Sequence, residues 1–112
     1  MPDQDWQTMH DSLAALQETL FHAALKAGSD DLRERLRAGA EAAADAVETM
    51  DRDDFESRTA RFQAVSEQAR KIAGDLDALR KQIAAITDKT DALKSAVEAI
   101  GQVLSQVSKF GV

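Results

Sequence analysis

Hydrophobic residues recur at every third or fourth position along most of the chain, which is the spacing of one face of an α-helix. The first such series contains Trp6, Met9, Leu13, Leu16 and Leu20, and Phe21 and Leu25 widen it. Gly28 comes next, where we expect it to end the helix in the left-handed conformation, and Ser29 is suited to cap the following helix. The pattern predicts a first helix from about residue 3 to residue 26.

A second helix is predicted from about residue 30 to residue 50, with a thinner apolar stripe that is rich in alanine around Gly39. Small side chains allow close approach of a neighbouring helix, so we expect residues 1–50 to form an antiparallel hairpin. Its predicted core residues are Trp6, Met9, Leu13, Leu16, Leu20, Leu32, Leu36, Val47 and Met50. Over 51–54, which has no glycine or proline, two outcomes are open: an aspartate caps a new helix, or the chain continues through a shift in the phase of the pattern.

The C-terminal half has a seven-residue repeat, with apolar residues at both core positions of each heptad. The predicted seam consists of Phe62, Val65, Ala69, Ile72, Leu76, Leu79, Ile83, Ile86, Leu93, Val97, Ile100, Leu104 and Val107, with Thr90 as its lone polar member. Because an ordinary helix drifts against a strict heptad, the repeat favours one continuous helix over about 54–108, roughly 80 Å long. The alternative is a four-helix bundle with a turn near 87–91, where Thr87 or Asp88 would cap the last helix.

The expected fold class is therefore all-α. Residues 1–50 form the hairpin and residues 51–112 form the coiled-coil segment, within one folding unit. A rod of that length would need partners to cover its seam. Isoleucine and valine at most of the second core positions favour a trimer or tetramer over a dimer.

Composition and charge narrow the function classes. The net charge of −6 argues against general binding of nucleic acid. Residues 1–60 carry 14 acidic and 6 basic side chains and residues 61–112 carry 6 and 8, so the N-terminal half is the acidic one. The chain has no cysteine, no apolar run of transmembrane length and no secretory leader, so we expect a cytoplasmic location. Export without a cleaved signal stays open.

No residue pattern predicts catalysis, a cofactor, a metal ion or a small-molecule substrate. His10 and His22 are twelve residues apart, too far round a helix to share a ligand. The run from Asp51 to Glu56 lacks the glycine and the glutamate of a calcium loop. We expect a non-enzymatic helical interaction or adaptor protein that self-associates through its coiled coil and presents surfaces to a protein partner.

Two alternatives remain from the sequence. The apolar faces of residues 6–25 and 95–112 would suit a protein that coats a lipid or hydrophobic-granule surface. Small size and an acidic N-terminal half would suit an inhibitor or immunity-type protein that covers a basic enzyme surface, with Asp51, Asp53 and Asp54 in contact.

Overall fold

The computed structural model describes residues 3–52, 57–86 and 90–109. Over these ranges the chain forms four α-helices and no strand: α1 (Asp3–Leu25), α2 (Asp30–Asp51), α3 (Arg58–Ala84) and α4 (Asp91–Lys109). The predicted all-α class is confirmed.

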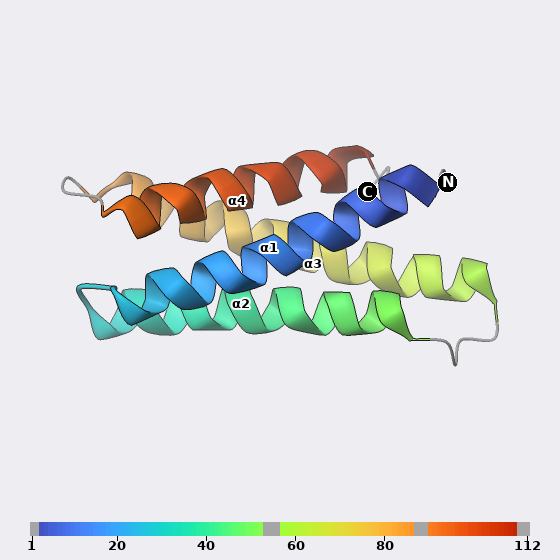
Figure 1. Ribbon diagram of the computed structural model, residues 1–112, viewed down its shortest axis with the longest axis horizontal. Coiled ribbons are helices and arrows are strands. Elements are labelled where there is room, and N and C mark those ends of the chain that lie inside the picture. The colour runs from blue at the N-terminus through green and yellow to red at the C-terminus, as the bar shows by residue number, and fades with distance from the viewer. Residues whose placement is uncertain (1–2, 53–56, 87–89, 110–112) are drawn as a thin grey trace.

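The four helices form an up-and-down bundle that measures 46 × 22 × 19 Å. Each helix packs against the next along the chain, and α4 closes the bundle by packing against α1, so α1 and α3 lie on one diagonal and α2 and α4 on the other. The start of α1 and the end of α4 lie at the same end of the bundle (Figure 1). Short connections between antiparallel neighbours are typical of this architecture.

The expected continuous helix over 54–108 is wrong, and the four-helix alternative is the one found. Helix α3 ends at Ala84 and α4 begins at Asp91, so the longest dimension is 46 Å instead of the length of a rod. Thr90 is exposed and lies outside the seam: the backbone N–H of Leu93 donates to its hydroxyl at 3.2 Å, which makes Thr90 the N-cap of α4. Thr87 and Asp88 lie outside the described residues.

The heptad repeat did not distinguish a long coiled coil from a four-helix bundle, because both bury residues at the same heptad positions. Helices that cross at a shallow angle bury a stripe with this spacing, whether their neighbours belong to one chain or to several. The phase also changes between α3 and α4. In α4 the fully buried side chains include Ala96 and Val103, which precede Val97 and Leu104, the predicted seam positions that are only partly buried.

The predicted seam lies inside this one chain. Its buried members are Val65, Ala69, Ile72, Leu76, Leu79, Ile83, Leu93, Ile100 and Val107, and its partly buried members are Phe62, Ile86, Val97 and Leu104. The N-terminal hairpin supplies the other half of the same core, in which Met9, Leu13, Leu16, Leu20, Leu32, Leu36 and Met50 are buried and Trp6 and Val47 are partly buried. The side chains expected to join several chains thus find apolar partners within their own.

Serine and threonine side chains start the helices after α1. Ser29 caps α2 as predicted, since its hydroxyl accepts the Leu32 backbone N–H at 3.2 Å. Helix α3 begins at Arg58 and is capped by Ser57, not by an aspartate of 51–54, since the Ser57 hydroxyl accepts the Ala60 N–H at 3.1 Å. The expected left-handed Gly28 is also wrong: its φ angle lies outside that region, and Lys26 and Ala27 close the end of α1 by donating to carbonyl groups three residues back.

Candidate interaction surface

His10 and His22 lie twelve residues apart on α1. Of the two, only His10 has a hydrogen-bond or ion-pair partner among the described residues. His10 Nε2 lies 2.9 Å from Asp51 Oδ1, which ties the first part of α1 to the last residue of α2. Its other ring nitrogen, Nδ1, is buried without a hydrogen bond and lies 3.6 Å from Asp11 Oδ1. His22 is exposed in the last turn of α1. The contact between His10 and Asp51 therefore links two helices and has a structural role.

A second contact between helices, formed by Arg61 and Trp6, lies at the same end of the bundle. The guanidinium group of Arg61, in the first turn of α3, sits 5.4 Å from the centroid of the Trp6 ring. It also donates to the carbonyl oxygen of Arg52 at 2.8 Å. This cation–π contact joins the diagonal helices α1 and α3 where the bundle core ends.

Within the described ranges, histidine, aspartate and glutamate side chains nowhere gather in a group of three that could hold a metal ion. No described helix has an apolar stretch of membrane-spanning length. Asp53, Asp54 and Glu56, part of the predicted acidic run, lie outside the described residues.

Helix α3 carries the clearest electrostatic cluster. Asp77 accepts from Arg80 at 2.8 Å and pairs with Lys81 at 3.1 Å, one turn along the same helix. The hydrogen bond from Lys81 and its positive charge, assisted by Arg80, lower the pKa of Asp77, while partial desolvation acts in the opposite direction. The cluster stabilises the C-terminal part of α3 and faces solvent.

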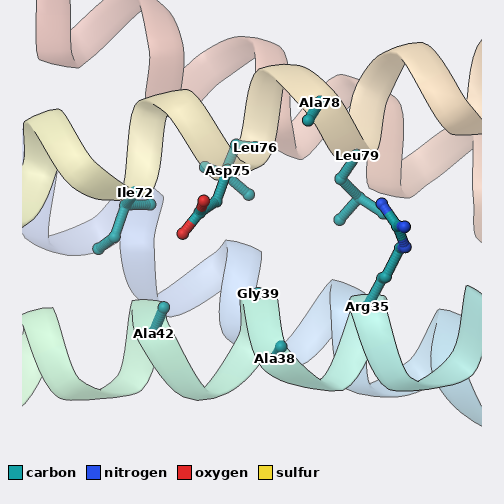
Figure 2. A pocket seen from close by; sticks show the side chains of 9 residues that line it. All are labelled: Arg35, Ala38, Gly39, Ala42, Ile72, Asp75, Leu76, Ala78 and Leu79. Atoms are coloured by element: carbon teal, nitrogen blue, oxygen red, sulfur yellow. The ribbon is translucent and has the colours of Figure 1, made fainter.

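A shallow groove runs between α2 and α3 (Figure 2). Ala38, Gly39 and Ala42 form its α2 side, and Ile72, Leu76 and Leu79 form its α3 side. Arg35 and Asp75 also line the groove, and Arg35 is already paired with Asp31 at 3.4 Å. The groove is open because the α2 side chains are too small to fill the space between the two helices.

A different pocket lies on the outer face of the hairpin, at the end of the bundle away from the start of α1. Phe21, Ala24 and Leu25 of α1 form one wall, and Arg33 and Arg37 of α2 form the other. Leu25 is 83% exposed and Phe21 is 37% exposed, and they are the large apolar side chains that the described part of the chain leaves exposed. We call these five residues the Phe21–Leu25 patch.

The hydrophobic pattern has Phe21 and Leu25 widen the apolar stripe of the first helix, whereas the structure leaves both side chains exposed. The last turns of α1 bury Ala23, Ala24 and Ala27 below Leu20, and each residue along a helix turns by about 100°. Phe21 and Leu25 each follow a buried residue, Leu20 and Ala24, and are therefore turned towards the outer face. Alanine at three inward positions was the signal that could have located the patch.

Comparison with protein-family models, curated proteins and solved structures finds no match to this chain. Inferences about function therefore depend on the geometry of the molecule itself.

Proposed function

We propose that the protein is a non-enzymatic helical interaction protein that binds a protein partner through its outer surface. The observation that carries the proposal is the exposure of Leu25, at 83%, beside Phe21 in a pocket between two helices. Large apolar side chains that cluster on the surface of a well-packed domain commonly mark a binding site. Here the exposed apolar side chains also line a pocket, whose walls come from both helices of the hairpin.

The proposal retains partner binding and drops the self-association that the heptads suggested. The side chains that would have formed an interface between chains, such as Ile83 and Ile100, are completely buried between helices of one chain. Exposing them for assembly would require opening the bundle. A partner must therefore contact the outer surface, where the described core residues do not have to move.

Two of the three surfaces behind the alternative functions, residues 95–112 and the acidic run, are less available than the sequence suggested. In α4, Ile100 and Val103 face the core, so the expected apolar face over 95–112 is turned inward across its described part. Of the acidic run, Asp51 is held by His10. Neither of these two surfaces offers an exposed apolar group comparable to Leu25, which belongs to the face of residues 6–25.

Site-specific photo-crosslinking in the native host tests the proposal. A benzophenone amino acid in place of Leu25 should give a discrete crosslinked species with another protein, because this position stands out from the surface. The same group in place of Gln63, which is exposed on α3, provides the matched control. Crosslinking that is absent at position 25, or equal at both positions, would contradict the proposed function.

A further inference from the structure

We infer that the Phe21–Leu25 patch binds an acidic amphipathic helical segment of the partner protein, with large apolar side chains in the pocket and carboxylates against the arginines. This inference rests on the proposed function and specifies the chemistry of the partner. Three observations carry it: the apolar wall, the charge of the opposite wall and the unpaired donors of one arginine.

The charged side chains that line the pocket have one sign. Arg33 and Arg37 stand one turn apart on α2, opposite Phe21 and Leu25. Arg33 donates to Asp30 at 3.0 Å, whereas Arg37 has no ion pair or hydrogen bond among the described residues. A guanidinium group presents its donors in a planar fork that matches a carboxylate. Arg37 is therefore positioned to receive a carboxylate from outside the chain.

The spacing of the apolar residues fits a helical ligand. Phe21 and Leu25 are four residues apart, so they form a ridge one turn long beside the α2 wall. An amphipathic helix that docks in a groove uses side chains at the same spacing as its anchors. Acidic residues that flank these anchors would reach Arg33 and Arg37 along α2.

Charge distinguishes this partner from other possible occupants. A second copy of the chain, related by a two-fold axis through the patch, would bring Arg33 and Arg37 close to the same residues of its mate. An anionic bilayer would meet the net charge of −6 over a wide area. A short segment meets mainly the charges within a screening length of about 10 Å. There Asp30 pairs with Arg33, while Arg37 lines the pocket without a carboxylate partner among the described residues.

The test uses the full chain, labelled for NMR at leucine methyl and arginine side-chain positions, and two synthetic helical peptides. Both peptides carry leucine at positions i, i+3, i+4 and i+7, one with glutamate and the other with lysine at the remaining positions. We expect the glutamate peptide to shift the signals of Leu25 and Arg37 and to bind at least tenfold more tightly than the lysine peptide. Equal affinity for the two peptides, or shifts confined to other surfaces, would overturn the inference.

Substitutions separate the two components of the site. Arg37→Glu should invert the preference between the peptides, while Arg70→Glu makes the same charge change at an exposed position of α3 and should not. Leu25→Ser should weaken binding of the glutamate peptide about tenfold or more without unfolding the chain, because this side chain is already 83% exposed. An unchanged preference in Arg37→Glu would overturn the role of the arginine.

Two further measurements address the competing occupants. Concentration-dependent shifts of Leu25 without peptide would identify a second copy as the occupant, and co-sedimentation with phosphatidylserine vesicles that Leu25→Ser abolishes would identify a lipid surface. Either result would overturn the inference. If crosslinking at position 25 yields a protein but the peptides are not distinguished, the proposed function stands and only the partner chemistry is wrong.

Discussion

Leu20 of α1 packs directly over Gly39 of α2: a Cβ atom added at position 39 would lie 3.0 Å from Cδ1 of Leu20. The same point is 3.6 Å from Cδ2 of Leu79, so both α1 and α3 approach α2 at this residue. Gly39 thus marks a point of close packing in the hairpin, and it also lines the groove in Figure 2.

The contact at Gly39 predicts that two helical glycines respond differently to substitution. Gly74→Ala, with no atom within 4 Å of the new Cβ, should stabilise the chain by about 1 kcal/mol because alanine favours the helix. Gly39→Ala should gain less, since Leu20 must move, and Gly39→Val should destabilise by about 1–3 kcal/mol through overpacking. Urea denaturation measures all three. A larger gain from Gly39→Ala than from Gly74→Ala would show that the helices are not in close contact here.

The burial of the former seam inside one chain predicts the effect of a charge there. Ile83 is completely buried, so Ile83→Asp should cost several kcal/mol and unfold much of the chain, as measured by circular dichroism. Lys81→Asp is the control on the same helix, with a side chain that is 76% exposed. It removes a surface ion pair with Asp77 and should change the free energy of unfolding only slightly. A folded Ile83→Asp variant would contradict the described core.

The hydroxyl of Thr90 is predicted to hold the first turn of α4. Thr90→Ala should destabilise the chain by about 1 kcal/mol because the Leu93 N–H loses its acceptor. Thr59→Ala, at an exposed position in the first turn of α3, is the control and should be close to neutral. Thermal unfolding of both variants would measure the difference, and equal midpoints would argue that α3 continues through this region.

The pair of His10 and Asp51 is predicted to couple α1 and α2. A double-mutant cycle with His10→Ala and Asp51→Ala should give a coupling free energy of about 0.5–1.5 kcal/mol, the range of an intramolecular hydrogen bond. The full cycle is needed because a carboxylate at the end of a helix is itself unfavourable, which offsets the effect of Asp51→Ala alone. Zero coupling would show that the contact does not stabilise the fold.

The Asp77 cluster predicts a pH dependence of stability. Since Lys81 and Arg80 lower the pKa of Asp77 in the folded state, its ionised form stabilises folding above the ordinary aspartate pKa, and this contribution is lost as the pH falls through the lower folded value. Wild type should therefore exceed Asp77→Asn in stability at neutral pH, with the difference shrinking in acid. Lys81→Gln should reduce that change. A difference that is constant between pH 7 and pH 2 would contradict the linkage.

Local signals in the sequence predicted most of the fold. They did not show whether the helices pack within one chain or between chains. The Gly-Ser junction and the apolar stripe of α1 and α2 placed the hairpin within one or two residues, and Ser29 was correctly assigned as a cap. The break after Ala84 was offered only as the alternative, because no glycine or proline marks it and the apolar pattern resumes one heptad later. Thr90 caps α4 and so marks where the new helix begins. The sequence alone did not show this, because a threonine can occupy either a core position or a cap.

The Phe21–Leu25 patch was not predicted from the sequence, for a related reason. Hydrophobicity alone extends the apolar stripe to Phe21 and Leu25, and the packing of Ala23, Ala24 and Ala27 shows that the core is already closed here. The pairing with Arg33 and Arg37 depends on the alignment of α1 with α2, which a single sequence does not specify to within one turn.

The described part of the chain has four helices, and neighbours along the chain run in opposite directions. The first residue of α1 and the last residue of α4 therefore lie on the same side of the bundle, away from Leu25 (Figure 1). An affinity handle or a fluorescent reporter attached at either extremity would therefore stand about a helix length from the pocket. Immobilising the protein on a biosensor through such a handle would leave the Phe21–Leu25 patch facing the solution, in an orientation suited to capture.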